Sequence, residues 1–275
     1  MSTNIYDSNV RNQGLINKIL EILNNREIIY ALVTNDFRSK YKRSSLGIFW
    51  SLINPLVTSL ILWIVFENVF KPHFEGSIQF APYLLAGVLL ISLFTSIVNN
   101  SAASISTHGN LIRRIFLSPS VYAFSSGISS LVNFLIGLIP LVFISILSGC
   151  QMGFRFFLLP FFVVSFFTFC YGLSLALGIV YVRFDDARYL FSLFLTLNSY
   201  MIPIFYPVSI LSKQLQTVVY LNPMTSFLDI FRFIILGTNT PGIYCWLYAV
   251  IISVLSFLIG SFVLNRYWRM AAMSL

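Results

Sequence analysis

Between Ile115 and Val182 the chain carries a single charged residue, Arg155. An apolar helix needs roughly 20 residues to cross the hydrocarbon core of a bilayer, so this stretch alone is long enough for two crossings. Only 9% of the 275 residues are charged, against about 25% in ordinary soluble domains. The sequence therefore predicts an all-α polytopic membrane protein.

Apolar segments of similar length recur along the chain and predict six transmembrane helices. They cover residues 46–70, 82–107, 121–147, 154–182, 190–205 and 243–264. Asn54 and Pro55 interrupt the first of them, and we expect a kink there because proline removes a backbone donor.

Two further segments contain apolar residues but lack the pattern or the length of a transmembrane helix. In residues 26–43 an apolar side chain recurs at every fourth position, which predicts an N-terminal amphipathic helix lying along the membrane interface. Residues 207–238 hold two apolar pieces separated by Asn222 and Pro223, each too short to span. We expect two short re-entrant helices before the last span. Asp229 and Arg232, three positions apart on the second piece, could pair on one helix face.

Lysine and arginine are unevenly divided between the two predicted sides. Thirteen of the 17 lie before the first span, in the link after the second, in the turn between the fourth and fifth, or in the tail. The opposite side holds only Lys71, Arg155, Lys213 and Arg232. Because basic residues mark the cytoplasmic side, both termini are predicted to be cytoplasmic. The same clustering at span ends explains the net charge of +8 without nucleic acid as a partner.

The second predicted span carries a stripe of small and polar side chains at helical spacing. Its members are Ser92, Ser96, Asn99, Asn100, Ala103 and Thr107. Such a stripe either lets two helices pack closely and hydrogen-bond, or lines a passage that contains water. The sequence leaves both interpretations open.

Signatures of chemistry are missing from the sequence. It has no GxxxxGK[ST] phosphate loop, no GxSxG elbow and no HExxH pair. His73 and His108 fall on opposite predicted sides, which argues against a shared metal site. Ion-coupled carriers usually place carboxylates at mid-membrane depth, whereas Glu67 is near a span end. We expect no catalytic residue, no metal and no cofactor on this chain.

Aromatic residues make up 17% of the chain. Some of them occupy the polar-interrupted first and fifth spans: Phe49, Trp50, Tyr200, Phe205 and Tyr206. Their flat faces could offer a sliding surface to sugar rings, since aromatic rings combine apolar area with, in Tyr and Trp, a polar group. Anchoring at the membrane interface is the alternative for each of them.

Several runs resemble the membrane subunit of bacterial polysaccharide exporters of the ABC-2 type, which move O-antigen, capsular polysaccharide or teichoic acid. LVTNDFRSKYKRSSLGIFWSLINPL resembles the entry to that subunit, and NLIRRIFLSPS resembles its cytoplasmic segment between the second and third spans. VRFDDARYLF, IPIFYPVSIL and YLNPMTSFLDIFRFIILG resemble its later block. The matching runs cover about residues 30–240, in the family's order.

The resemblance implies a single transmembrane domain over residues 1–275, acting as permease subunit in the bacterial inner membrane. Two copies would form a channel for a lipid-linked polysaccharide, with O-antigen as the first choice of polymer. Two separate ATP-binding-cassette ATPase subunits would hold ATP and Mg²⁺ on the cytoplasmic side. Residues 108–119 would form a cytoplasmic coupling segment.

The resemblance also implies roles for individual residues. Contacts with the ATPase subunits would come from Arg26, Asp36, Arg38, Lys40, Asn110, Arg113, Arg114, Phe116, Asp185 and Arg188. The channel lining would include Phe49, Trp50, Asn54, Tyr200, Phe205 and Tyr206. The external re-entrant segment would be marked by Pro207, Asn222, Pro223, Asp229 and Arg232.

Three other functions remain open at this point. A permease of the same architecture for a small lipid or drug would show no link to glycan synthesis. A membrane-embedded glycosyl or acyl transferase would need an acid or base from Asp185, Asp186 or His108, and would work without an ATPase. A passive channel would show flux that does not depend on ATP.

Overall fold

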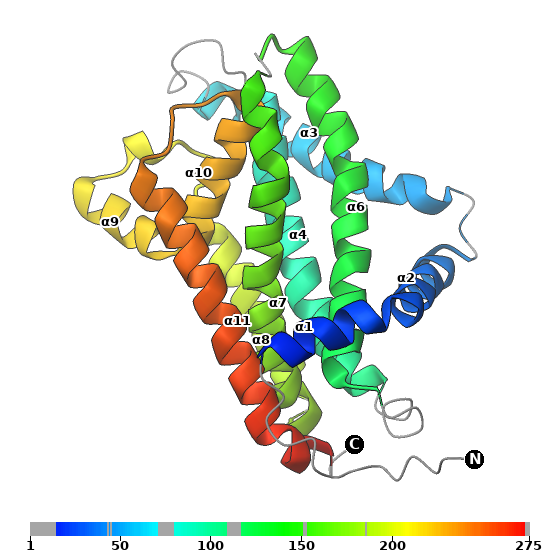
Figure 1. Ribbon diagram of the computed structural model, residues 1–275. Coiled ribbons are helices and arrows are strands. Elements are labelled where there is room, and N and C mark those ends of the chain that lie inside the picture. Colours follow the sequence, from blue (N-terminus) through cyan, green and yellow to red (C-terminus); the bar gives the residue numbers. More distant parts are fainter. Residues whose placement is uncertain are drawn as a thin grey trace, which may run out of the picture.

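The computed structural model describes residues 15–42, 44, 46–70, 80–108, 117–150, 153–184 and 186–272. Figure 1 shows four long helices standing side by side: α4 (Phe80–Thr107), α6 (Pro119–Leu147), α7 (Leu159–Arg183) and α11 (Ile243–Ala272). Each is long and apolar enough to cross a membrane, α7 together with the 3-10 turn η3 (Phe154–Leu158) that precedes it. Segments with so little charge favour the lipid interior. There no water is available to the backbone, and a helix satisfies its backbone hydrogen bonds internally.

The first and fifth predicted spans differ from these four. α3 (Trp50–Phe70) follows a 3-10 turn, η1 (Gly47–Phe49), and its described apolar part covers only Trp50–Val65. In Figure 1 it crosses the long helices steeply. α8 (Ala187–Met201) ends before residue 205, because Pro203 cannot continue a helix and restrains the residue before it.

The described residues therefore contain four candidate spans where the sequence predicted six. The number becomes five if the two short helices α9 (Lys213–Leu221) and α10 (Pro223–Leu236) form one broken span. α11 is longer than the predicted 243–264, and its apolar part extends to Trp268. Neither Gly nor Pro occurs in its last turns, so nothing stops the helix there.

α9 and α10 confirm the prediction of two short helices before the last span. They follow a 3-10 turn, η4 (Val208–Ile210), and meet at an angle of 93°. Asn222 makes the corner: its side chain accepts a hydrogen bond from the Met224 N–H (3.1 Å) and donates one to the Asn198 side chain on α8 (2.7 Å). Pro223 occupies the first position of α10, where its missing N–H costs nothing.

α10 lies in the core of the bundle. Phe227 and Phe231 are both fully buried against rings of α7: Phe231 stacks on Phe162, and Phe227 meets Phe166 edge to face with the centroids 5.0 Å apart. Gly237 ends the helix with a φ of 71°, a left-handed conformation that suits glycine. The second of the two predicted re-entrant helices is thus packed among the long helices.

α2 (Arg26–Tyr41) confirms a helix where the amphipathic segment 26–43 was predicted; Arg43 lies outside the described residues. Its apolar side contacts protein: Ile29 and Leu32 pack on a small cluster at the start of α6, together with Trp268 of α11. A shorter helix, α1 (Leu15–Asn24), precedes it. The helix predicted to lie along the membrane interface is therefore also packed against α6.

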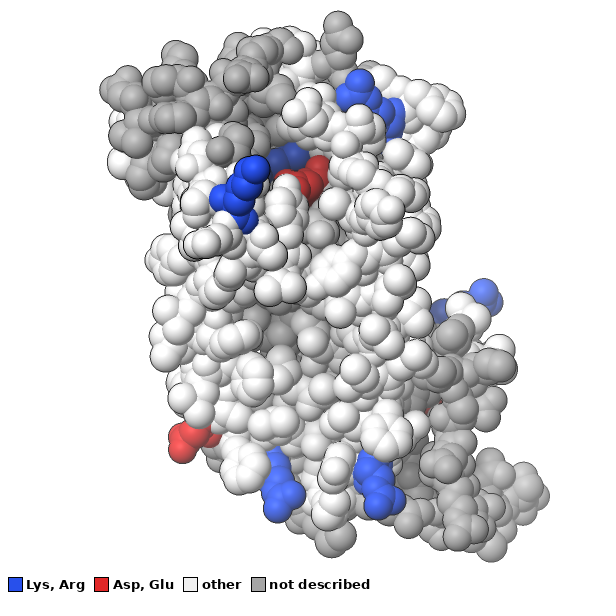
Figure 2. All heavy atoms as spheres, turned by 90° about the vertical axis from the view of Figure 1, so that its left-hand side faces the viewer, with Lys and Arg blue, Asp and Glu red and all other residues white. Residues whose placement is uncertain are grey.

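The two ends of the bundle carry the charges. Figure 2 shows blue and red atoms near both ends of one face, with a band between them that is uncharged except for blue atoms at its right-hand edge. At one end the last turns of α4 and α7 meet the start of α8, where Arg188 donates to the Ser106 hydroxyl (2.9 Å). At the other end Arg155 lies over the Phe233 ring, 5.2 Å from its centre. The uncharged band has the character of a lipid-facing surface.

Candidate functional site

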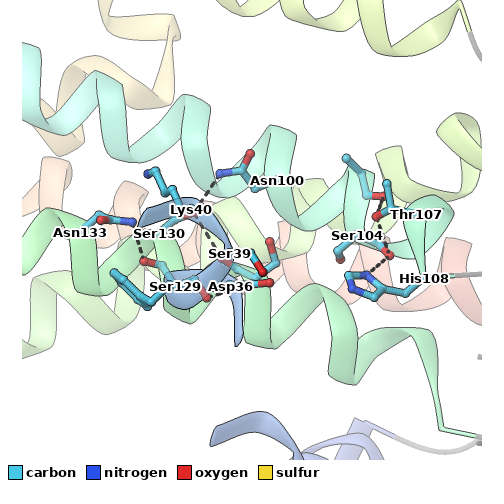
Figure 3. Close-up of a pocket in the computed structure, with 13 residues that line it drawn as sticks. Asp36, Ser39, Lys40, Asn100, Ser104, Thr107, His108, Ser129, Ser130 and Asn133 are labelled. Carbon is cyan, nitrogen blue, oxygen red and sulfur yellow. Dashed lines mark hydrogen bonds between the residues drawn. The ribbon is translucent and has the colours of Figure 1, made fainter. Parts of the chain in front are cut away.

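Two adjoining cavities lie between α2, α3, α4 and α6, with volumes of about 300 and 260 Å³. They share Lys40, Asn100, Ser130 and Asn133, so we treat them as one polar trough. Figure 3 shows the part of it beneath α2, where side chains from α2, α4 and α6 point toward one another. The polar trough is lined by Asp36, Phe37, Ser39, Lys40, Tyr41, Trp50, Ser51, Asn54, Pro55, Leu89, Ser92, Leu93, Ser96, Asn100, Ala103, Ser104, Thr107, His108, Ser126, Ser129, Ser130, Asn133 and Phe134.

One wall is the polar stripe of α4 that the sequence revealed. Five of its six members line the trough, the exception being Asn99. Asn99 instead accepts a hydrogen bond from the Tyr181 hydroxyl of α7 (3.4 Å). The stripe thus faces a hollow along most of its length and serves close helix packing at one position.

The facing wall on α6 was missed by the sequence interpretation. It consists of Ser126, Ser129, Ser130 and Asn133. The two walls touch where the Asn100 side-chain amide donates to the Ser130 hydroxyl (3.3 Å). The spacing of these residues at i, i+3, i+4 and i+7 is the signal that could have found them, since it places them on one helix face.

α2 covers the trough from outside. The Asp36 carboxylate accepts a hydrogen bond from the Ser129 hydroxyl (3.0 Å), which holds the middle of α2 to α6. Lys40, one turn further on, is exposed, with its ammonium 5.6 Å from the centre of the Tyr41 ring. The trough therefore has one carboxylate tied to its wall and one cation at its opening.

Three helices meet at Asn133. Its side-chain oxygen accepts hydrogen bonds from the Tyr41 hydroxyl at the end of α2 (3.1 Å) and from the Ser51 hydroxyl at the start of α3 (2.9 Å). The Tyr41 and Ser51 hydroxyls also contact each other. This Asn133 junction fixes the turn from α2 to α3 against α6.

Replacing Asn133 by leucine is expected to lower stability by about 1–3 kcal/mol, because two partly buried hydroxyls lose their acceptor. Thermal unfolding of the purified chain in detergent measures the effect. Asn35→Leu, at an exposed position of α2, is the matched control. The cost of Tyr41→Phe should shrink in the Asn133→Leu background, since the two changes remove the same contact. The junction would be contradicted if Asn133→Leu cost no more stability than Asn35→Leu and if the costs of Tyr41→Phe and Asn133→Leu were additive.

Only some of the predicted ATPase-contact residues are among those that the structure describes. Arg26 and Arg38 are exposed on α2, and Arg188 is exposed at the start of α8. Asp36 and Lys40 line the trough. Asn110, Arg113, Arg114, Phe116 and Asp185 lie outside the described residues, as does most of the predicted coupling segment 108–119.

The predicted channel residues fall into two places. Trp50 and Asn54 line the trough, and Phe49 is 60% exposed just before them. Tyr200 is exposed on α8, Phe205 packs against the core, and the Tyr206 carbonyl accepts from the Tyr83 hydroxyl (3.3 Å). Those three residues do not line the trough, so one subunit does not bring the two groups together.

In the predicted external segment, Pro207 precedes η4, and Asn222 and Pro223 form the corner between α9 and α10. Asp229 accepts a hydrogen bond from the Tyr220 hydroxyl (3.1 Å). Arg232 is 2% exposed and donates to backbone carbonyls. The expected Asp229–Arg232 pairing is therefore replaced by separate partners for each residue.

Hydroxyl and amide groups dominate the chemistry of the trough. Its titratable side chains are Asp36, Lys40, Tyr41 and His108. His108 is held at the end of α4, where its Nδ1 lies 3.0 Å from the Ser104 carbonyl oxygen and its ring stacks on Tyr122. Such a surface exchanges hydrogen bonds with water or with hydroxyl-rich molecules, which both donate and accept.

A helical bundle with an uncharged band, charged ends and a polar trough defines a polytopic membrane protein with a polar internal face. Comparison with known sequences then places it: the profile of the ABC-2 type transporter family matches residues 27–236. The chain belongs to this family of membrane permeases, whose members lack the ATPase domain. Family membership implies an ATPase partner.

Distant relatives are polysaccharide export permeases. The chain is 24% identical over 229 residues to the O-antigen export system permease protein RfbA of Myxococcus xanthus, covering 82% of this chain and 87% of the relative. RfbA of Klebsiella pneumoniae is 22% identical over 203 residues, covering 74% and 77%. The capsule polysaccharide export inner-membrane protein CtrC of Neisseria meningitidis serogroup A is 21% identical over 254 residues, covering 90% and 93%.

Proposed function

We propose that this chain is the permease subunit of an ATP-driven exporter that moves a lipid-linked polysaccharide across the bacterial cytoplasmic membrane. O-antigen is the first choice of polymer, with capsular polysaccharide or teichoic acid as the other members of the class. The observation that carries the proposal is the similarity to O-antigen and capsule export permeases over most of the chain. The hydroxyl- and amide-lined trough supports it, because a glycan needs such partners inside a membrane.

The whole chain, 1–275, acts in this proposal as one transmembrane domain with both termini in the cytoplasm. The excess of Lys and Arg on one predicted side supports this orientation. Two copies form the channel. This arrangement would let the first-span and fifth-span aromatics of different subunits face one another. Two ATPase subunits bind ATP and Mg²⁺ at the cytoplasmic end.

Coupling would pass through α2. Movement of an ATPase subunit displaces this helix, and two contacts carry the displacement into the bundle: the Asp36–Ser129 hydrogen bond and the Asn133 junction. Both lead to α6, and the junction also leads to α3. Coupling requires that these contacts differ in free energy between two states of the passage.

Surface polysaccharide tests the function directly. The chain's gene is deleted in its native bacterium, and surface polysaccharide is measured per cell before and after it is restored. We expect loss on deletion, accumulation of lipid-linked polymer inside, and recovery on restoration. Unchanged surface polysaccharide, with a different lipid or drug retained in the cell, would contradict the proposal.

The partner is tested separately by purifying the tagged chain in mild detergent from its native membrane. Mass spectrometry should find one ATPase subunit per copy, carrying a phosphate-loop motif. A chain that purifies alone and modifies a lipid-linked sugar would favour a transferase instead.

A further inference from the structure

Arg232 is a buried cation in the core of a membrane protein. It lies in the second half of α10 and is 2% exposed. An unpaired charge buried among apolar side chains is costly, and buried ionisable residues of membrane proteins generally mark functional positions whose partners can be named. Asp229, three residues earlier on the same helix, accepts a hydrogen bond from Tyr220 on α9 and acts on Arg232 through its charge. The hydrogen-bond acceptors of Arg232 lie on other segments.

Those partners are backbone carbonyls on two other segments. One terminal nitrogen donates to the Pro203 carbonyl (2.9 Å), and the other to the carbonyls of Ile204 (2.9 Å) and Tyr83 (3.4 Å). The guanidinium also lies over the Tyr83 ring, 3.4 Å from its centre, in cation–π contact. One side chain thus joins α10 to the break after α8 and to the start of α4.

The chain break explains why these carbonyls need a donor. α8 ends at Met201, and the next regular turn begins at Val208, so residues between them lie outside any helix. Ile202, Pro203 and Ile204 are nevertheless buried. Buried carbonyls without a helical partner need another donor. Arg232 supplies it from the opposite side of the break.

A glycine on α4 makes room for this arrangement. A Cβ added at Gly87 would lie 3.1 Å from a terminal nitrogen of Arg232 and 2.8 Å from the Ile204 side chain. Any larger residue would push the guanidinium or the break away from α4. Gly87 on α4 therefore leaves the space that the Arg232 guanidinium, from α10, occupies.

We infer that Arg232 is a positioning residue that fastens α10 and the 202–206 break to α4, and that export depends on this attachment. The inference rests on the proposed function for its second half. The break separates α8 from the bent pair α9–α10. Loss of the Arg232 attachment would let α8 and the α9–α10 pair move relative to the long helices, at the end of the passage opposite the ATPase.

Hydrogen–deuterium exchange of the purified full chain in detergent tests the attachment. In Arg232→Gln, exchange across residues 202–206 and the first turns of α4 should rise roughly tenfold or more, the effect of losing charge-assisted hydrogen bonds. Arg155→Gln is the matched control. Arg155 lies in η3 and contacts the ring of Phe233, the neighbour of Arg232 on α10, but Arg155 is exposed. Its replacement should leave this exchange unchanged. Equal exchange in Arg232→Gln and wild type overturns the attachment.

Surface polysaccharide per folded permease in the membrane tests the dependence of export. We expect a drop of about tenfold or more in Arg232→Gln and partial recovery in Arg232→Lys, which keeps the charge but lacks the planar fork. A purely structural role would lower the amount of folded permease and leave export per folded molecule unchanged, and that result overturns the inference. Failure of the wild-type chain to restore export overturns the proposed function, while the exchange result still decides the attachment.

Discussion

Replacing Gly260 by leucine is expected to prevent the chain from accumulating folded in the membrane. Gly260 lies on α11 where this helix crosses α7, and a Cβ built on it would collide with the backbone carbonyl of Gly172. A Cβ on Gly172 would in turn collide with the backbone at Ser256. Close to the crossing, the Ser256 hydroxyl donates to the Phe169 carbonyl (2.8 Å). The two helices approach backbone to backbone, as small residues allow in membranes.

The cost of Gly260→Leu should be about 3 kcal/mol or more, because backbone atoms cannot move aside as a flexible side chain can. That is a large part of a stability of about 5–15 kcal/mol. The measurement is the folded fraction in membranes, read by size-exclusion profile and thermal unfolding. Gly242→Leu serves as control, since nothing lies within 4 Å of a Cβ at that position. Similar folded fractions for the two variants would show that the crossing tolerates separation.

The long helices were predictable because one property, the absence of charge over about 20 residues, determines them. Breaks were predictable where proline coincides with a short apolar length, as at Asn222 and Pro223. The end of α8 was placed four residues too late because the IPIFYP run is apolar, and hydropathy does not register its two prolines. Helix length and composition also gave no information on the steep course of α3.

The site was only half predictable, for a different reason. The α4 stripe contains two adjacent asparagines, which are conspicuous in an apolar helix. The α6 wall contains mainly serines scattered through an apolar run, and serine is common wherever membrane helices pack. The partners of Arg232 could not be predicted either. They are backbone carbonyls, which every residue possesses, so no side-chain pattern distinguishes Pro203, Ile204 and Tyr83.

The position of α2 shows how packing changes the meaning of an amphipathic pattern. Its apolar side chains predicted contact with lipid, yet Ile29 and Leu32 contact protein, and Asp36 bonds to the wall of the trough. A carboxylate on that face would be unfavourable against lipid and is satisfied against Ser129. The polar interruption in the apolar face therefore indicates a protein contact.

Ser96→Trp is expected to abolish export while leaving the amount of folded chain nearly normal. Ser96 lines the trough from α4 and is only partly buried. An indole there would occupy much of a cavity of about 260 Å³ and would replace a hydroxyl by a largely apolar ring. If polymer or its lipid-linked end passes through or beside the trough, surface polysaccharide per folded permease should fall by about tenfold or more, equivalent to about 1.4 kcal/mol or more.

The same substitution separates the two interpretations of the α4 stripe. If the stripe served helix packing, tryptophan would overpack the contact and cost about 1–3 kcal/mol of stability, lowering the folded amount while export per folded molecule stayed normal. Ile139→Trp provides the control, because Ile139 is 65% exposed on the outer side of α6 and an indole is tolerated at a lipid-facing position. A normal export ratio in Ser96→Trp would mean that the polar trough is a packing defect filled by water and that the polymer takes another path.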